Sequence, residues 1–481
     1  MNLFILGLGH VRPEQINIVK ELQKTHHISY WVRMEHVFQI NKNEFPNTVF
    51  HNYRDALDGK PASGIDDSDF EPLSQESLIK FSETEAEILT MMEKKFELWS
   101  VNQKRDFYFD LMRYWRGVFE KFKPDLIIFS DVPHEVYSFV VYALAKDYGV
   151  KTIMFENIFD YGRLILFHDY KFGNDVLAEA KKNNFSEDYR LEDLSDYTRE
   201  YYKKQISGKD ETPLYVSGYN KEHSGWNKFS RLTKARWAFV KDGTIFERAV
   251  KRFFKLFKSN VIKDYKKLET PPDFGKKFIY VPLHFQPERT TSPQGGYFVD
   301  QLLMVKTLSH ALPEGWLLYV KEHPSQWKPH GSDYTGYRYP GYYEEIIKLK
   351  NARIVPVSTN NYELIKNSQA VATVTGIPGW EAILRGKPAL IFGYSWFMQA
   401  PGVFRVQSVN DCRDVFEKIE NGYRADMQKM LNYTVLLDKT SFEGFNDNYG
   451  RQVSKITDED NASNMFKVIK SAIEKISLPT V

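Results

Sequence analysis

The sequence is poor in cysteine and has no long run of apolar residues. Cys412 is the only cysteine among 481 residues, so it cannot form a disulfide within the chain, and no metal-ligand spacing involves it. No stretch reaches the roughly 18 consecutive apolar residues that a membrane-spanning helix needs. The start, "NLFILGLGH", follows Met1 without basic residues and is typical of a buried strand rather than a signal peptide. These absences predict a protein of the reducing cytoplasm.

An excess of charge of either sign is missing as well. The chain has 65 basic and 63 acidic residues, a formal net charge of +2, whereas a dedicated nucleic-acid binder usually carries a clear basic excess. We therefore expect no nucleic acid among its partners. The Lys and Arg residues between 249 and 267 are expected to form a solvated helix face. Contact with an acidic membrane surface is the alternative, and it would place the protein peripherally on the inner face of a membrane.

Two stretches of the sequence alternate apolar strands with helices. The first covers residues 1–170, with a polar insertion or helical cover at about 55–105, and the second covers residues 271–410. The strands expected in the first are "LFILGLG", "HISYWVR", "DLIIFSD" and "KTIMFEN", and the second begins with "KKFIYVPLHF". Repeated strand–helix–strand units predict a parallel sheet with helices on both faces. We therefore predict an α/β protein with two Rossmann-like lobes that face a cleft.

Two further stretches lack this alternation. Residues 171–270 are rich in Lys, Tyr, Asn and Ser, and they predict a helical linker or insertion. Residues 411–481 predict helices that pack back across the two lobes.

Ligands of such sheets bind beyond the carboxyl ends of the strands, which makes the residues after each strand the candidate site residues. In the first lobe they are Gly9, His10, Asp131, His134 and Glu156. Asp131 closes an apolar strand, and it could take a proton from a substrate or attack it. The alternative is that Asp131 is the N-cap of the helix in "PHEVYSFVVY".

In the second lobe, two strand ends are rich in polar residues. The residues after the first strand are His284, Gln286, Glu288 and Arg289. The stretch "VKEHPSQ" supplies Lys321, His323 and Pro324. Lys321 and His323 alternate to the same face of their strand. We expect them to converge on one phosphate, to which Lys brings charge and His a hydrogen bond or a proton.

The stretch "TVTGIPGWEAI" predicts a turn from a strand into a helix. Thr375 and Gly376 end the strand, and free backbone N–H groups at the start of the helix would bind an anion. Gly379 would let the helix begin close to a ligand. Glu381, expected in the first helical turn, would accept hydrogen bonds from ribose hydroxyls. Together these residues predict a nucleotide-sugar site, and an ordinary helix start in the core is the alternative.

Three motifs resemble the capsule polysaccharide biosynthesis family, which includes bacterial Kdo transferases that use a CMP-activated sugar. They are "VPLHFQPERTTSPQGGYFVDQLLMV", "LYVKEHPSQ" and "VATVTGIPGWEAILRGKPALIFG", in this order. The resemblance covers roughly residues 275–405, while the first lobe matches only in pattern. It implies a two-lobed fold of the GT-B type, with the sugar donor in the second lobe and a glycan or glycolipid acceptor in the first.

The resemblance also implies roles for individual residues. His323 and Pro324 correspond to a His-Pro motif that contacts the phosphate of CMP, and Thr375 and Gly376 match a phosphate-binding turn. Asp131 falls where such enzymes place an essential carboxylate, a match that rests on strand order alone. The chain departs from the family pattern after Gly376, where Ile377 and Pro378 replace the small residue that relatives often have.

The implied activity is glycosyl transfer without a metal or other cofactor. Metal-dependent transferases hold a divalent ion on an Asp-x-Asp pair, and one such triplet, Asp67-Ser68-Asp69, lies in the polar insertion rather than at a strand end. Two alternatives remain open. One is an enzyme of the same fold that uses a UDP-sugar, such as a 2-epimerase, and the other is a non-catalytic scaffold of capsule assembly.

Overall fold

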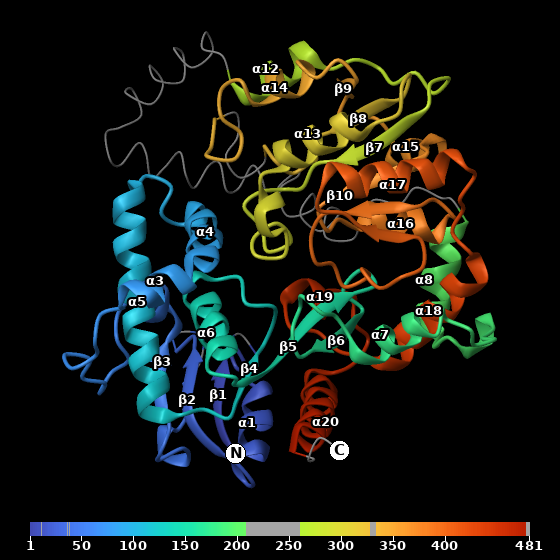
Figure 1. The fold of residues 1–481 in the computed structure, drawn as a ribbon. Helices are drawn as coiled ribbons and strands as arrows, with labels where there is room; N and C mark the ends of the chain where they lie inside the picture. Colours follow the sequence, from blue (N-terminus) through green and yellow to red (C-terminus); the bar gives the residue numbers. More distant parts are fainter. Residues whose placement is uncertain (11, 36, 38, 208–259, 328–332, 478–481) are drawn as a thin grey trace, which may run out of the picture.

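The computed structural model describes residues 1–10, 12–35, 37, 39–207, 260–327 and 333–477. Within them, two β-sheets form two lobes (Figure 1). The first sheet has seven strands in the order β13-β6-β5-β4-β1-β2-β3, and the second has six in the order β12-β11-β10-β7-β8-β9. Both sheets contain the strand order of a doubly wound Rossmann sheet. The predicted fold class, α/β with two Rossmann-like lobes, is confirmed.

The first sheet is parallel except at one edge. Its strands are β1 (Asn2–Leu6), β2 (His27–Arg33), β3 (Val49–Asn52), β4 (Leu126–Phe129), β5 (Lys151–Ile158), β6 (Arg163–Phe167) and β13 (Ser441–Glu443). β6 and β13 pair antiparallel to their neighbours. The sequence analysis did not predict β3, β6 or β13.

Helices cover this sheet, and the stretch at 55–105 is largely a helical cover. The helices are α1 (Gln15–Gln23), α2 (Tyr53–Leu57), α3 (Gln75–Lys80), α4 (Ser82–Met91), α5 (Val101–Phe122) and α6 (Val136–Asp147). α5 begins at a capping box, in which the Ser100 N–H donates to Gln103 Oε1 and the Gln103 N–H donates to Ser100 Oγ. Short 3-10 turns lie at η1 (Lys42–Glu44) and η2 (Met92–Lys94).

The second sheet is parallel throughout. Its strands are β7 (Phe278–Pro282), β8 (Leu317–Lys321), β9 (Ala352–Ile354), β10 (Ala370–Thr373), β11 (Ala389–Ile391) and β12 (Val403–Arg405). Its helices are α12 (Val261–Leu268), α13 (Gln301–Ala311), α14 (Tyr342–Ile347), α15 (Asn361–Asn367), α16 (Ile377–Leu384) and α17 (Val409–Glu420), with a 3-10 turn at η4 (Gly296–Val299).

The chain passes between the lobes twice. After β6 come α7 (Asp175–Lys182), η3 (Leu191–Asp193) and α8 (Asp196–Ile206). The rest of the expected helical linker, residues 208–259, lies outside the described residues, as does most of the basic run at 249–267. At the other end, α18 (Met427–Thr440), α19 (Asn448–Val453) and α20 (Asp458–Ser477) follow the second lobe. The chain returns to the first lobe there, because β13 pairs with β6 and α20 packs on α1 (Figure 1).

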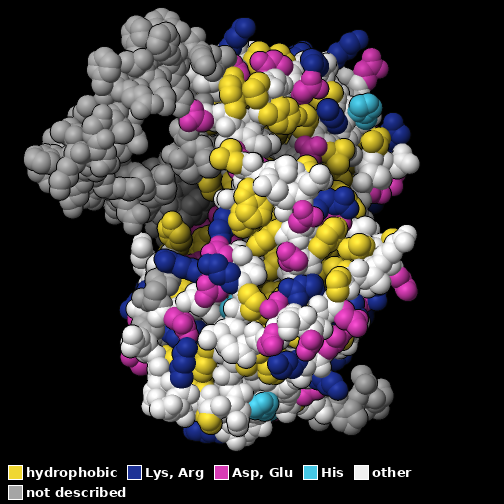
Figure 2. All heavy atoms as spheres, turned by 90° about the vertical axis from the view of Figure 1, so that its left-hand side faces the viewer, with side chains coloured by type: hydrophobic (Ala, Val, Ile, Leu, Met, Phe, Trp, Pro, Cys, Tyr) yellow, Lys and Arg dark blue, Asp and Glu magenta, His cyan; other side chains and the backbone are white. Residues whose placement is uncertain are grey.

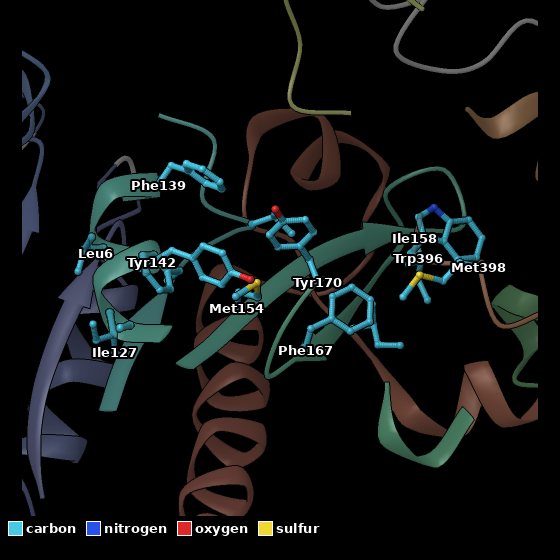
Figure 3. Packing of buried hydrophobic residues seen from close by; sticks show 14 of the residues in the cluster. Leu6, Ile127, Phe139, Tyr142, Met154, Ile158, Phe167, Tyr170, Trp396 and Met398 are labelled. Carbon is cyan, nitrogen blue, oxygen red and sulfur yellow. The ribbon is translucent and has the colours of Figure 1, made fainter. Parts of the chain in front are cut away.

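One hydrophobic core extends through both lobes. It joins residues of the first sheet and α6 to residues that follow β11 in the second lobe (Figure 3). The labelled members are Leu6, Ile127, Phe139, Tyr142, Met154, Ile158, Phe167, Tyr170, Trp396 and Met398. Trp396 lies between the lobes, with its ring centroid 5.9 Å from that of Phe159 and 4.7 Å from that of Trp380. Apolar side chains of both lobes therefore pack against each other in one core.

The described surface mixes charges of both signs. Figure 2 shows acidic and basic side chains interspersed on the face that lies to the left in Figure 1. Among the helices that the structure describes, none is long and apolar enough to cross a membrane.

Candidate active site

Each sheet has a topological switch point, where strand order reverses and ligands of such folds bind. In the first lobe it lies between β1 and β4, and in the second between β7 and β10. Gly7, which follows β1, has φ +97°, and a Cβ there would lie 2.0 Å from Ser130 Oγ, next to β4. Only glycine fits this close approach. The segments after these four strands form the two halves of the candidate site.

His284 lies at the switch point of the second lobe, and it is buried. Its Nε2 accepts a hydrogen bond from the Thr375 N–H at 3.2 Å and lies 3.0 Å from Thr373 Oγ1. Burial, aided by nearby His323 and Arg338, lowers the pKa of His284 to about 3, so the ring is neutral at neutral pH. These contacts assign the hydrogen to Nδ1, which donates to no acceptor among the described residues. His284 therefore has a donor to offer to a ligand.

The turn after β10 differs from the expected anion site. The Thr375 N–H donates to His284 and the Gly376 N–H to Thr373 Oγ1, while the Gly379 N–H donates to the Gly376 carbonyl. Pro378 has no N–H. The expectation of several free N–H groups at this helix start is therefore wrong, because two of them bond within the turn and the third bonds to His284. A phosphate here would depend more on side chains than on the helix terminus.

Gly379 and Glu381 also differ from their predicted positions. A Cβ at Gly379 would lie 3.2 Å from Thr373 Cγ2 and 3.4 Å from the Phe397 ring, so this glycine faces the interior and not a ligand. α16 begins at Ile377, which makes Glu381 its fifth residue, beyond the first turn. The Glu381 carboxylate lies 3.9 Å from the Arg385 guanidinium. The ribose contact predicted for Glu381 is not supported by this orientation.

Gln286 belongs to a buried polar network under the loop that follows β7. Its Oε1 accepts hydrogen bonds from Gln301 Nε2 at 2.6 Å and from Arg338 Nη1 at 2.9 Å. Arg338 also pairs with Glu322 at 2.5 Å, with side chains 1% and 0% exposed, and donates to the His284 carbonyl at 3.3 Å. Gln286 and Glu322 therefore shape the loop, and the predicted contact of Gln286 with the nucleotide would have to be indirect.

Lys321 and His323 do not converge as expected. Lys321 Nζ donates to the Thr359 carbonyl and to Asn361 Oδ1, at 2.5 and 2.6 Å, and so ties the end of β8 to the start of α15. His323 is half-buried, and its Nδ1 accepts from the Ser325 N–H at 3.1 Å, next to the exposed Pro324. His323 is close enough to His284 to lower its pKa. His323 is therefore a neighbour of His284 rather than of Lys321. We call His284 and His323 together the histidine corner.

Asp131 meets the second lobe directly. Arg289 Nη1 donates to Asp131 Oδ1 at 2.9 Å across the boundary between the lobes. His134 Nδ1 lies 3.5 Å from the same oxygen. α6 begins at Val136 with Glu135 as its N-cap, so the alternative that Asp131 caps this helix is wrong. The ion pair between Asp131 and Arg289 thus links the end of a first-lobe strand to the second lobe.

The other predicted residues of the first lobe have different environments. Glu156 is buried, which raises its pKa against the opposing charge of Arg289, and it accepts from Gln294 Nε2 of the second lobe at 3.1 and 3.2 Å. Burial, with the positive charge of Arg33, lowers the pKa of His10 to about 4. Gly9 has φ +70°, and its N–H donates to Gln15 Oε1 inside the lobe. Gly9 therefore supports the turn.

Several residues of the site were not predicted from the sequence. Gln294 and Arg338 lie in irregular segments without a pattern that marks them. Asn446 and Asp447, far along the chain, lie beside Asn157, whose Nδ2 contacts both of their side chains at 2.7 and 3.1 Å. Asn446 Nδ2 also donates to the Ser130 carbonyl at 3.2 Å. No sequence signal pointed to these contacts.

Glu288 is exposed, and its carboxylate accepts from the Arg289 N–H at 2.9 Å. It lies at the rim of the loop, where a donor contact remains a prediction. In the part of the chain that the structure describes, no three His, Cys, Asp or Glu side chains gather as ligands of a metal ion.

Comparison with solved structures gives distant likenesses. The chain is similar to KpsC of Thermosulfurimonas dismutans, a beta Kdo 2,7 transferase, with 13% identity over 74% of this chain and 89% of that one and a TM-score of 0.31. It is also similar to UDP-GlcNAc 2-epimerase from Neisseria meningitidis bound to UDP-GlcNAc, with 13% identity over 99% and 100% of the two chains and a TM-score of 0.25. No curated protein sequence matches the chain.

A family model gives a match within the sequence itself. It is described as "Capsule polysaccharide biosynthesis protein", and it covers residues 286–439. This range begins in the loop after β7 and ends in α18, so it contains Arg289, His323 and the turn at Thr375. Over residues 286–439, the predicted resemblance of the chain to the capsule polysaccharide biosynthesis family is confirmed.

Proposed function

We propose that the protein is a glycosyltransferase of surface or capsular polysaccharide biosynthesis. It would transfer Kdo or a related acidic sugar from a CMP-activated donor to a glycan or glycolipid acceptor. The observation that carries the proposal is the course of one loop, residues 283–292. At His284 and Thr290 this loop bonds to the turn at Thr375, and at Arg289 it bonds to Asp131 of the other lobe. The turn that would bind the nucleotide is thereby joined to the carboxylate of Asp131 through a single short segment.

The second lobe would hold the nucleotide. The neutral ring of His284 offers its Nδ1–H to a phosphate oxygen, and His323 stands next to it as a second donor. Hydrogen bonds to a phosphate that carries the leaving charge stabilise the transition state most when they are held in place beforehand. The network of Arg338, Gln286 and Glu322 supplies this rigidity by fixing the loop from below.

The first lobe would supply the chemistry at the sugar. Asp131 could act as a base on the acceptor hydroxyl, which gives inversion at the anomeric carbon. It could instead attack that carbon, which gives retention through a covalent adduct. In both cases the carboxylate must be ionised and must face the donor across the cleft. Its ion pair with Arg289, a residue of the nucleotide lobe, is consistent with this placement.

The reaction would proceed without a metal ion. The triplet at Asp67-Ser68-Asp69 has a different task, because Asp67 accepts hydrogen bonds from Arg113 at 2.6 and 2.8 Å and thereby ties the cover to α5. Charge on the departing phosphate would be met by the histidine corner. Activity that survives EDTA supports this part of the proposal, while activity that EDTA abolishes and magnesium restores contradicts it.

Titration with CMP by calorimetry tests the proposal. The wild-type protein should bind CMP, and His323→Ala should weaken the affinity about tenfold, the cost of one hydrogen bond to a charged group. His310→Ala is the matched control, because His310 is exposed on α13 and donates only to the Lys306 carbonyl. UDP binding without CMP binding would favour the UDP-sugar enzyme, and binding of neither would favour the scaffold.

A further inference from the structure

Arg289 has more hydrogen-bonding capacity than its contacts use. A guanidinium has five N–H donors, and in the described part of the chain Asp131 is the one acceptor bonded to the Arg289 side chain. Nε and Nη2 have no protein acceptor there. The side chain is 16% exposed, so it is largely but not completely withdrawn from solvent. Such a cation is prepared to bind a second anionic group.

The position of Arg289 defines what that group could be. Arg289 lies in the loop that contacts the turn at Thr375, and its side chain bonds to Asp131, the carboxylate proposed to act at the sugar. It therefore lies on the short loop that joins the turn at Thr375 to Asp131. A group bound there would belong to the sugar ring near its anomeric carbon.

Electrostatics distinguish two classes of sugar at this place. In a 2-ulosonic acid the carboxylate is attached directly to the anomeric carbon, so it must come close to Asp131 when the sugar reacts. Two like charges at such separation repel each other, and the repulsion is large in a partly buried site. A guanidinium between them removes this repulsion, and its planar fork binds a carboxylate through two parallel hydrogen bonds. A neutral sugar offers only hydroxyl groups, which accept weaker hydrogen bonds from a guanidinium than a carboxylate does.

We propose that Arg289 binds the carboxylate of a 2-ulosonic acid donor and thereby selects acidic sugars over neutral ones. In the absence of donor the guanidinium pairs with Asp131, and in its presence it bonds to both carboxylates through different nitrogens. This inference rests on the proposed function, because it takes a CMP-activated donor as given. It adds the residue that recognises the acidic group of the sugar.

Binding of CMP and of CMP-Kdo, measured without acceptor, tests the inference. For Arg289→Gln, we expect CMP affinity to stay within about twofold of wild type, because the inference assigns Arg289 to the sugar carboxylate and not to the nucleotide. Affinity for CMP-Kdo should fall on the order of tenfold to a hundredfold, the loss expected for a charge-assisted carboxylate contact. Arg289→Lys should recover part of this loss. Arg413→Gln, on the exposed face of α17, is the control and should leave both affinities unchanged.

A second variant separates ligand recognition from a purely structural role. If Arg289 only fixed Asp131, Asp131→Asn would weaken CMP-Kdo binding as much as Arg289→Gln does. The inference instead expects Asp131→Asn to retain or increase CMP-Kdo affinity, because it removes a like charge. Equal binding of CMP-Kdo by wild type and Arg289→Gln would overturn the inference and leave the proposed function standing. Failure of the wild type to bind either ligand would overturn both.

Discussion

Asp131 is bound by a cation of the opposite lobe and has no part in capping α6, which begins at Val136. Its role can therefore be tested by a substitution that preserves shape. In a helix cap, Asp and Asn are nearly equivalent, whereas an amide can neither accept the acceptor's proton nor form a covalent adduct. Asp131→Asn should therefore affect the reaction and not the stability of α6.

We expect Asp131→Asn to lower turnover by about 10²- to 10⁴-fold, which is the usual contribution of a general base. CMP affinity should stay nearly constant, since the nucleotide corner is formed by other residues. Steady-state rates with CMP-Kdo, together with CMP titration, measure both quantities. A fully active variant would move the chemical role to Glu156 or Glu288, two further carboxylates of the candidate site.

Glu87 on α4 is buried beside the boundary of the lobes, where a Cβ at Gly296 would come within 4.0 Å of its Oε1. Burial raises its pKa to about 7, against the opposing effect of Lys171. Between pH 4.5 and 7 the folded protein therefore holds a proton that the unfolded chain has released. The contribution of Glu87 to stability is full below this range and is lost as pH rises through it.

Glu87→Gln should remove this dependence. Relative to wild type, the variant should gain stability as pH rises from 4.5 to above 7, by about 1–3 kcal/mol, because each pKa unit corresponds to about 1.4 kcal/mol. Urea unfolding at pH 5, 6, 7 and 8 measures the difference. Glu76→Gln on exposed α3 is the surface control. A constant difference between Glu87→Gln and wild type over this range would mean that Glu87 is not protonated in the folded state.

At the scale of the element, the loop after β7 depends on a buried ion pair. Arg338 reaches it from an irregular segment before α14 and pairs with Glu322 at the end of β8, where Tyr343 also donates to Glu322 at 2.7 Å. Burial of two charges is costly, and it is tolerated here because the guanidinium also bonds to Gln286 and to the His284 carbonyl.

Arg338→Met should destabilise the protein by about 3–5 kcal/mol, since it leaves Glu322 charged and unpaired in the interior. The double variant Arg338→Met with Glu322→Gln should lose less than the single variant, because the orphaned charge is removed. Urea unfolding of the two single variants and the double variant gives the coupling energy. Additive losses would show that the pair contributes little beyond its separate contacts.

Some helices and strands could be predicted from the sequence, and others could not. The longer strands were predicted because buried parallel strands are continuous apolar runs, and Asp131 was found because it ends one of them. β13 has three residues and lies within residues 411–481, whose pattern predicts helices. Glu381 was expected in the first helical turn, but α16 already begins at Ile377, with Pro378 in its first turn. The Arg289–Asp131 pair depends on how the two lobes face each other, which the sequence pattern does not contain.

At the scale of the whole molecule, the shared core determines how the protein unfolds. Trp396 packs against Phe159 of the first lobe and Trp380 of the second. Because apolar contacts join the lobes, we expect one cooperative thermal transition rather than two. Trp396→Ala should destabilise the protein by about 3–5 kcal/mol, the usual cost of removing a large buried aromatic side chain.

Scanning calorimetry measures this directly. The variant should melt at a lower temperature than wild type, because it loses apolar contacts with both lobes. Leu98→Ala, which truncates a fully exposed side chain, is the control and should leave the melting temperature unchanged. Two transitions in the wild type, with only one affected by Trp396→Ala, would contradict the shared core.

The late return of β13 to the first sheet has a consequence for synthesis on the ribosome. β6 is paired on one side by β5 and on the other by Ser441–Glu443, which are translated some 270 residues after it. Until then, the nascent first lobe presents an unpaired strand edge, the kind of surface on which other chains add strands. We expect ribosome-bound fragments that stop before residue 440 to need chaperone protection, while the second lobe is still being made.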